Sequence, residues 1–306
     1  MPTTRIISVY GPKGGVGTSF IANNLALGIA LGTHKPTLLI DLDTLRAGSQ
    51  ASLLALEREV EKHHLGTLAQ QDRINPHVLE QFIVSHPSNL SLLAAPTLET
   101  THFISSIKFM ELLFAASEKF SNIVIDAAQP LLTDLLAVCL DYSAVVLTTL
   151  IPDIIALQYT TDFLNKAEKH NFNLNKFHLI VNMNGLSSDL SFQDISEYFL
   201  DILKRPIEYE LPLESEIVVK SINQGIPLIQ KQKQSHLLEA LLNLIKSTLK
   251  IPELDLHQVS VPTERSPFWS LRSGITQEIS ISQPPQTKAL ALIQHSIPGW
   301  LPEDYR

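Results

Sequence analysis

The sequence predicts an α/β fold in which a mostly parallel, doubly wound sheet carries helices on both faces. Three observations support this prediction. Short apolar runs typical of buried strands alternate with amphipathic helical patterns, a glycine-rich loop follows the first run, and acidic residues follow two later runs. Alternation of this kind favours parallel strands joined by right-handed crossovers. Because such crossovers bring the carboxyl ends of the strands to one edge, we expect the functional site there.

The composition is that of an ordinary globular protein. The chain has 306 residues, of which 44% are hydrophobic, and its formal net charge is −8. That charge disfavours binding to nucleic acid through clustered lysine and arginine, and we expect no sequence-specific nucleic-acid partner. The sequence shows neither a run long enough to span a membrane nor a signal peptide, so we expect a cytoplasmic protein. The single cysteine, Cys139, lies in an apolar run and is expected in the core.

The glycine-rich loop lies between a predicted strand, residues 5–10, and a predicted helix. Glycines let backbone N–H groups close around phosphate oxygens, and the hydroxyl of Ser19 can bind Mg²⁺. An ordinary P-loop would have Gly at position 12 and Lys at position 18, where this chain has Pro12 and Thr18, and Lys13 supplies a cation from the other side of the loop. The residues we expect to bind phosphate are Gly14, Gly15, Val16, Gly17, Thr18 and Ser19. A glycine-rich turn that binds nothing is the alternative.

The helix after the loop repeats apolar residues at helical spacing from Ile21 to Ala30, and Gly32 is expected to end it in the left-handed conformation. Phosphate in the loop would meet the N-terminus of this helix, where free N–H groups favour an anion. A second apolar strand, residues 37–40, leads into Asp41 and Asp43. Carboxylates at the carboxyl end of a strand near the loop can hold Mg²⁺ or orient water, although two acidic residues that merely end a strand are the alternative.

The middle of the chain continues the alternation. Helical periodicity is predicted for residues 49–60 and 104–120, and strands for residues 90–96 and 122–126. Asp126 ends the second of these strands and is expected to support Mg²⁺ through water. The neighbouring histidines His63 and His64 lack a cysteine or carboxylate at ligand spacing, so we do not predict a metal site there.

The last third of the predicted domain contains strands at residues 144–149 and 177–181, with helices at residues 154–169 and 235–249. Asn182 follows one of these strands, where an asparagine can either bind a ligand or cap a turn. We expect a domain boundary at residue 250. Residues 252–306 hold seven of the 18 prolines and both tryptophans, so residues 251–306 are predicted to form an irregular extension that wraps the surface or binds a partner, with one short helix near residues 288–295.

Three segments carry a resemblance to a known family. The run from Lys13 to Ser19 resembles the deviant Walker A loop of the ParA/MinD family of P-loop ATPases, which is marked by an early lysine. The missing lysine at position 18 with Asn-Asn-Leu-Ala at residues 23–26, and the Ala-Ala-Pro that ends the strand at residues 90–96, are similar to one branch, the CpaE/TadZ-type proteins of Flp (Tad) pilus assembly. Residues 208–212, with Gly-Ile-Pro-Leu at residues 225–228, resemble the closing strand and the following turn of the ParA/MinD family. The resemblance covers about residues 5–250.

The resemblance implies a MinD-like P-loop NTPase fold that binds ATP with Mg²⁺ and forms a homodimer. It implies that Lys13 reaches the nucleotide of the partner subunit and that Asp43 serves hydrolysis. Asn182 would contact the adenine edge, and Pro212 would lie in the loop on the adenine side. The metal would be held by Ser19, Asp41 and Asp126.

The resemblance also implies a function and its partners. The expected function is to localise or assemble a cell-surface machine, for which pilus or secretion proteins are the partners, and any membrane or polar association would be indirect. The family often has Pro-Gln-Gly-Asn after Asp43, whereas residues 44–48 here read Thr-Leu-Arg-Ala-Gly. With this departure and with Thr18 in place of lysine, we expect slow or absent hydrolysis. A nucleotide-independent pseudo-ATPase scaffold and a DNA- or plasmid-partition ATPase are the alternatives.

Overall fold

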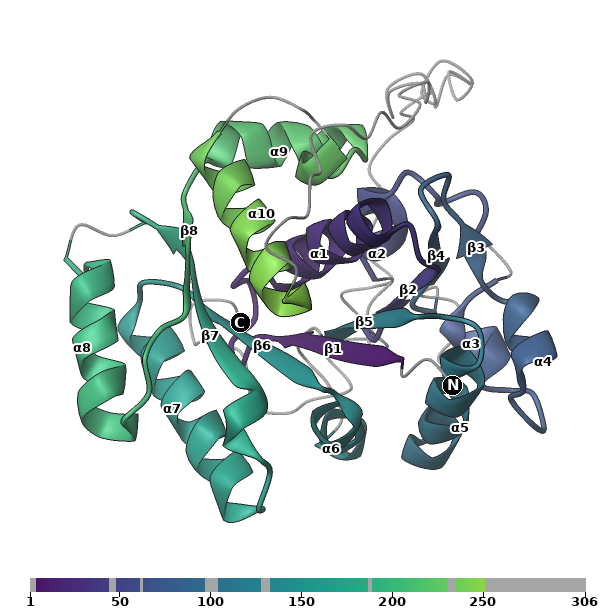
Figure 1. Cartoon of the computed structure of the whole chain (residues 1–306), viewed down its shortest axis with the longest axis horizontal. Helices are drawn as coiled ribbons and strands as arrows, with labels where there is room; N and C mark the ends of the chain where they lie inside the picture. The colour runs from purple at the N-terminus through teal and green to yellow at the C-terminus, as the bar shows by residue number, and fades with distance from the viewer. Residues whose placement is uncertain are drawn as a thin grey trace, which may run out of the picture. The chain divides into compact units, whose positions relative to one another are not determined.

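An eight-stranded sheet with the order β3-β4-β2-β5-β1-β6-β7-β8 organises the computed structural model (Figure 1). The structure describes residues 4–43, 48–60, 63–96, 104–127, 133–186, 189–230 and 235–250. The strands are β1 (Arg5–Tyr10), β2 (Thr37–Asp41), β3 (Val84–Ser85), β4 (Leu90–Leu93), β5 (Asn122–Ala127), β6 (Val145–Leu150), β7 (Phe177–Asn184) and β8 (Tyr209–Pro212). Neighbouring strands are parallel except for β3, which runs antiparallel to β4 at one edge. The predicted fold class is confirmed.

Helices cover both faces of the sheet, as Figure 1 shows. The helices are α1 (Thr18–Thr33), α2 (Gln50–Leu53), α3 (Leu65–Leu68), α4 (Pro76–Glu80), α5 (Ser106–Ser117), α6 (Thr133–Tyr142), α7 (Ile154–Lys169), α8 (Phe192–Leu203), α9 (Ser215–Gln224) and α10 (His236–Leu249), with short 3-10 helices η1 (Leu174–Lys176) and η2 (Leu228–Gln230). Helices α1 and α10 pack on one face and α5 to α8 on the other. Both faces are therefore apolar, which explains why the central strands read as continuous apolar runs.

The central strands alternate between the two cores. Ile7 and Val9 of β1 point into the core beside α1 and α10, whereas Ile6 and Tyr10 point into the core beside α5 and α6. The first core also brings α1 close to α10, because a Cβ added at Gly28 would lie 2.3 Å from the Ile245 Cδ1 atom. Glycine at position 28 thus sets the distance between these helices and anchors the helix that follows the loop.

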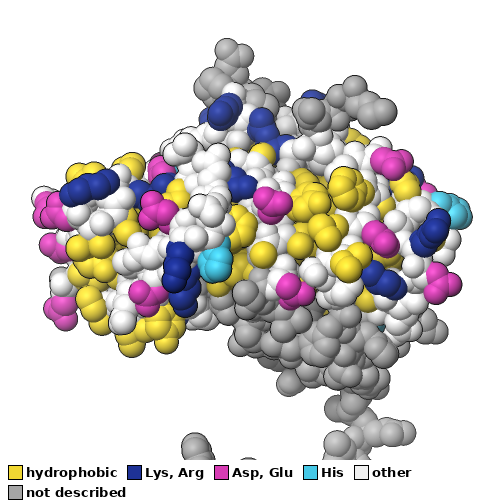
Figure 2. Space-filling model, turned by 90° about the horizontal axis from the view of Figure 1, so that it is seen from below, with side chains coloured by type: hydrophobic (Ala, Val, Ile, Leu, Met, Phe, Trp, Pro, Cys, Tyr) yellow, Lys and Arg dark blue, Asp and Glu magenta, His cyan; other side chains and the backbone are white. Residues whose placement is uncertain are grey.

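Hydrophobic side chains lie exposed among charged ones on the face that carries α5 to α8 (Figure 2). Among the described residues of these helices, the large apolar side chains that are most exposed are Ile107 and Phe114 on α5, Ile154 on α7, and Leu200 and Ile202 on α8. Within the described ranges, none of the helices combines the length and apolar character needed to cross a bilayer.

Four local predictions differ from the structure. Helix α1 continues through Gly32, and His34 adopts the left-handed conformation instead, with a φ of 54°. The helix predicted over residues 49–60 is only α2, because the chain turns at Ala55, which has a φ of 51°. Strand β7 extends to Asn184, so Asn182 lies within the strand. The antiparallel edge strand β3 was not predicted. The proposed extension, residues 251–306, with its predicted helix and its tryptophans, lies outside the described residues.

His64 caps the N-terminus of α3. Its Nδ1 atom accepts hydrogen bonds from the backbone N–H groups of Gly66, at 3.1 Å, and Thr67, at 3.3 Å. These bonds require an unprotonated Nδ1 atom. Burial lowers the pKa of His64 below its ordinary value of 6.5, and the neighbouring His63 adds to this effect. The folded chain therefore favours the neutral imidazole.

This cap predicts a dependence of stability on acid. The folded-state pKa of His64 lies below the pKa of the same residue in the unfolded chain. The stabilisation that the His64 cap gives to the folded chain is therefore complete above pH 6.5, and it is lost as the pH falls through the lowered pKa. We expect the His64→Asn variant, which keeps a capping side chain, to lose about 1 kcal/mol less than the wild type between pH 7 and pH 5. Urea unfolding at the two pH values measures this difference. His170→Asn, which changes an exposed histidine, is the control. Equal losses of stability between pH 7 and pH 5 in the wild type and both variants would contradict the prediction.

Candidate nucleotide-binding site

The glycine-rich loop leaves the carboxyl end of β1 and runs directly into α1. Gly15 and Gly17 have φ values of 82° and 89°, in the left-handed region that favours glycine. The side chain of Asn182 on β7 donates from Nδ2 to the Val16 carbonyl oxygen at 2.9 Å, and a Cβ added at Gly17 would lie 2.2 Å from this nitrogen. The loop conformation is thus set both by glycine and by the close approach of β7.

The outer side of the loop is open. No described atom lies within 4 Å of a Cβ added at Gly14 or Gly15. Gly17 caps α1 without a side-chain hydrogen bond, and the first turn of α1 carries no acidic residue. The first N–H groups of this 16-residue helix are therefore not bound by a capping side chain. Loop and helix together have the geometry that suits a phosphate group.

Asp41 and Asp126 lie side by side at the carboxyl edge of the sheet, because β2 and β5 are neighbours and these two residues are register partners. Asp41 accepts at Oδ1 from the Asp43 N–H at 3.0 Å, and at Oδ2 from the N–H groups of Ser49 and Gln50 at 3.1 and 3.0 Å. Burial raises the pKa of Asp41 against the lowering effect of these three bonds. Asp41 thus holds the N-terminal end of α2 close to the glycine-rich loop.

Asp126 is fully buried. Burial and then the charge of Asp41 raise its pKa to about 8, although hydrogen bonds from Gln50 and Ser19 act to lower it. Its Oδ2 atom accepts a hydrogen bond from Gln50, while Oδ1 has no hydrogen-bond partner among the described residues. Two buried carboxylates with an unpartnered oxygen fit a divalent cation such as Mg²⁺, since an ion would offset both the burial and the repulsion. Asp43 lies next to Asp41 and is 8% exposed.

Gln50, which the sequence did not single out, joins these parts. Its Nε2 atom donates to Asp126 Oδ2 at 2.7 Å and to the Ser19 carbonyl oxygen at 3.0 Å. Its Oε1 atom accepts from Asn23 on α1 at 2.9 Å. Neither residue type nor spacing marks a glutamine nine positions after an aspartate as part of a site, so only the fold identifies it.

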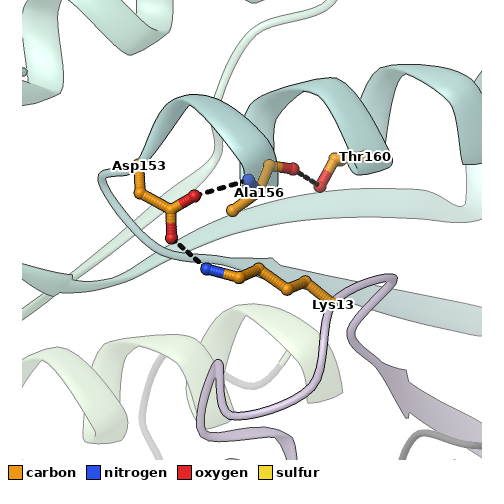
Figure 3. Close-up of polar contacts among 4 residues, drawn as sticks. All are labelled: Lys13, Asp153, Ala156 and Thr160. Atoms are coloured by element: carbon orange, nitrogen blue, oxygen red, sulfur yellow. Dashed lines mark hydrogen bonds and ion pairs between the residues drawn. The ribbon is translucent and has the colours of Figure 1, made fainter. Parts of the chain in front are cut away.

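Lys13 and Asp153 form an ion pair across the outside of the loop (Figure 3). Asp153 also caps α7, because its Oδ1 atom accepts from the Ala156 N–H at 2.7 Å. Burial pushes the pKa of Asp153 upwards, but the hydrogen bonds from Lys13 and Ala156 outweigh it and lower the pKa. Both side chains are about a third exposed, at 29% and 31%. Lys13 therefore lies at the rim of the loop with an intramolecular partner, which the sequence did not predict.

The residues predicted for the adenine side occupy two places. Asn182 is buried and holds the loop through Val16, and Pro212 is the last residue of β8, opposite Asn184. On α1, the Oδ1 atom of Asn24 accepts from the Ile229 N–H of η2 at 3.0 Å. The structure thus brings the loop, Asp41, Asp126 and Asn182 together at one edge, as predicted from topology.

Comparison with known proteins places this site in a family. A family model described as an AAA domain matches residues 4–179 of the chain. The chain belongs to this AAA-domain family. The matched residues include the glycine-rich loop, Asp41, Asp43, Asp126 and the ion pair of Lys13 with Asp153. A comparison with curated proteins finds no match.

Solved structures share the fold of this AAA domain. A ParA family ATPase from Chlorobium tepidum has a TM-score of 0.69 at 19% identity, covering 79% of this chain and 98% of that chain. The septum site-determining protein MinD from Pyrococcus horikoshii, complexed with Mg-ADP, has a TM-score of 0.67 at 22% identity, covering 84% of this chain and 100% of that chain. An ATP complex of a Cyanothece McdA variant has a TM-score of 0.64 at 20% identity, covering 83% of this chain and 100% of that chain. The fold is therefore that of the ParA and MinD ATPases.

Proposed function

We propose that the chain binds ATP with Mg²⁺, dimerises in response, and thereby localises or assembles a cell-surface machine. One observation carries this proposal: the open glycine loop at the N-terminus of α1 lies at the same sheet edge as the buried pair Asp41 and Asp126. The solved structures of similar fold that contain Mg-ADP or ATP support the choice of ligand. The machine that the sequence resemblance favours is a Flp/Tad-type pilus, through similarity to the CpaE/TadZ-type proteins.

Each predicted site residue has a proposed task. The amides from Gly14 to Thr18 hold phosphate, and Ser19 binds the metal through its hydroxyl, with Asp41 and Asp126 supporting the ion. When bound, Mg²⁺ would neutralise charge on the phosphates and on the two carboxylates. Asp43 orients an attacking water. Asn182 and Pro212 border the adenine side, with Asn182 also holding the loop as described.

Dimerisation would use the rim of the loop. Lys13 ends there, and the first turn of α7 beside Asp153 exposes Ile154 and Ile155, which are 69% and 49% exposed. Exposed apolar side chains next to a partly exposed cation suit a surface that a second copy covers. In the dimer, Lys13 would leave Asp153 and contact the nucleotide of the partner. A solved chain of similar fold comes from the MinC:MinD cell division protein complex of Aquifex aeolicus. This supports the further proposal that the dimer recruits other proteins.

We expect hydrolysis to be slow or absent. Position 18, where an ordinary P-loop has lysine, is Thr18, so the subunit lacks one donor to the transferring phosphoryl group. A single electrostatic donor of this kind is worth roughly 3–4 kcal/mol in other enzymes. A turnover rate equal to that of an intact P-loop ATPase, and abolished by Asp43→Ala, would contradict this part of the proposal.

The deciding experiment is a titration of the purified chain with ATP and Mg²⁺, followed by mass measurement in solution. We expect saturable binding and a dimer for the wild type, and for Lys13→Ala we expect binding without dimerisation. A dimer indifferent to nucleotide, with no saturable binding, would instead support a pseudo-ATPase scaffold. Salt-sensitive binding to DNA would support a partition ATPase.

The assembly role is tested in cells. Deletion of the gene should remove the surface pili, and the wild-type gene should restore them where the Lys13→Ala gene does not. Normal pili in the deletion strain would contradict the pilus role. That result would not bear on nucleotide-dependent dimerisation, which the titration tests separately.

Weakening the pair between Lys13 and Asp153 is expected to favour the dimer. Asp153→Asn keeps a capping oxygen for α7 but removes the charge that holds Lys13. Because the pair is partly exposed, we expect the concentration of ATP at half-dimerisation to fall by no more than about fivefold. Light scattering during an ATP titration measures the shift. Glu80→Gln, which removes the surface pair of Glu80 with Lys119, is the control; an unchanged or higher midpoint for Asp153→Asn would contradict the prediction.

A further inference from the structure

The carboxamide of Gln50 is fully buried and all of its polar atoms are engaged. The two bonds donated by Nε2 go to Asp126 and Ser19, and the bond accepted by Oε1 comes from Asn23. The backbone N–H of Gln50 also donates to Asp41. Gln50 therefore bonds to all three residues that would hold the metal ion, although its bond to Ser19 goes to the backbone carbonyl and not to the hydroxyl.

The orientation of this carboxamide is dictated by its neighbours. Nε2 faces two acceptors, the Asp126 carboxylate and the Ser19 carbonyl, and Oε1 faces a donor. If the amide were flipped, its oxygen would meet both acceptors and its NH₂ group would meet the NH₂ group of Asn23. A neutral side chain that donates twice and accepts once satisfies this position, whereas a carboxylate would repel Asp126.

The bond from Gln50 involves only one of the two carboxylate oxygens of Asp126. Gln50 occupies Oδ2 at 2.7 Å, and Oδ1 has no partner among the described residues although it is buried. A carboxylate held by one oxygen cannot rotate freely, so the other oxygen keeps a fixed place for a cation or its water. Hydrogen bonds of this kind to metal-binding carboxylates typically govern their geometry.

We propose that Gln50 is the positioning residue of the metal site: it holds Asp126 by Oδ2 and the Ser19 backbone by its carbonyl, so that Mg²⁺ meets a preformed arrangement. The inference rests on the proposed function, because it assigns Gln50 a task toward the ion that accompanies the nucleotide. Asn23 acts one step further away by fixing the amide of Gln50.

The test separates metal binding from stability. Mn²⁺ replaces Mg²⁺ as a paramagnetic probe, and electron paramagnetic resonance measures its affinity in the presence of a saturating non-hydrolysable ATP analogue. Nucleotide affinity is measured separately in EDTA. We expect Gln50→Leu to weaken Mn²⁺ binding by about 10- to 100-fold while metal-free nucleotide affinity stays unchanged, because outer-shell partners act on the metal. Asn23→Ala should shift Mn²⁺ affinity in the same direction by a smaller factor.

Asn24→Ala is the matched control. Asn24 is the next residue on α1 and is equally buried, but it bonds η2 and not Gln50. Its loss should lower thermal stability and leave Mn²⁺ affinity unchanged. If Gln50→Leu fails to fold, the contrast between Asn23→Ala and Asn24→Ala carries the test.

The two proposals fail differently. A wild type that binds the Mn²⁺–nucleotide complex, with Gln50 and Asn23 variants that bind it equally well, would overturn the role of Gln50 alone, even if the variants were less stable. A wild type that binds no nucleotide, with or without Mn²⁺, would overturn the proposed function and this inference with it.

Discussion

Gly17→Ala is expected to lower the free energy of unfolding by about 3 kcal/mol, the sum of backbone strain and crowding. Gly17 has a φ of 89°, which an alanine adopts only with strain. The new Cβ would also lie 2.2 Å from the Asn182 Nδ2 atom, so Asn182 would have to release the Val16 carbonyl oxygen. Urea unfolding of the nucleotide-free protein measures the loss.

The same substitution should abolish measurable binding of ATP, because the loop amides would no longer converge. Gly14→Ala is the control for stability, since no described atom lies within 4 Å of its added Cβ and its φ is not positive. Equal stability of the Gly17 and Gly14 variants would show that β7 does not set the loop conformation.

Asp126→Asn is expected to stabilise the nucleotide-free protein while it removes the stabilisation by Mg²⁺–ATP. The asparagine oxygen can still accept from Gln50, but the buried acid disappears. The pKa of Asp126, raised to about 8, lies far above that of an unfolded aspartate, near 3.8. Between these values the folded chain binds a proton that the unfolded chain releases, so wild-type stability falls as the pH rises toward 8.

At pH 8 in EDTA we expect the variant to exceed the wild type by a few kcal/mol, on the order set by the pKa shift, and the difference should shrink toward pH 5. Thermal unfolding across this range measures it. Addition of Mg²⁺–ATP should then raise the melting temperature of the wild type but not that of the variant. Asp134→Asn, at an exposed position on α6, is the control. A variant less stable than the wild type at pH 8 would contradict a raised pKa.

The prediction for Asp126→Asn illustrates how a functional site departs from what stability favours. A buried carboxylate with one unpartnered oxygen lowers the stability of the nucleotide-free chain. The proposed ligands would compensate, since phosphate satisfies the helix N-terminus and Mg²⁺ offsets the charge of Asp41 and Asp126. Nucleotide would therefore act both as ligand and as a stabilising part of the fold.

Much of the architecture was predictable because it follows from local patterns. Strand β1 and helix α7 begin and end at the residues predicted from periodicity, and the loop lies between strand and helix as the motif requires. Asp41 and Asp126 could be placed at one edge because parallel strands with right-handed crossovers bring their carboxyl ends together. Short-range rules failed where the chain turns at residues with positive φ, as at His34 and Ala55.

The sequence by itself determined the fold class, the loop and the acidic strand ends, since each depends on residues close together in the chain. Only the tertiary structure decided the partners of the key side chains. Lys13 pairs with Asp153, 140 residues away, Asn182 holds Val16, 166 residues away, and Gln50 holds Asp126, 76 residues away. Such contacts depend on the order and register of strands, and no periodicity in the sequence records which side chains that order brings within hydrogen-bond distance.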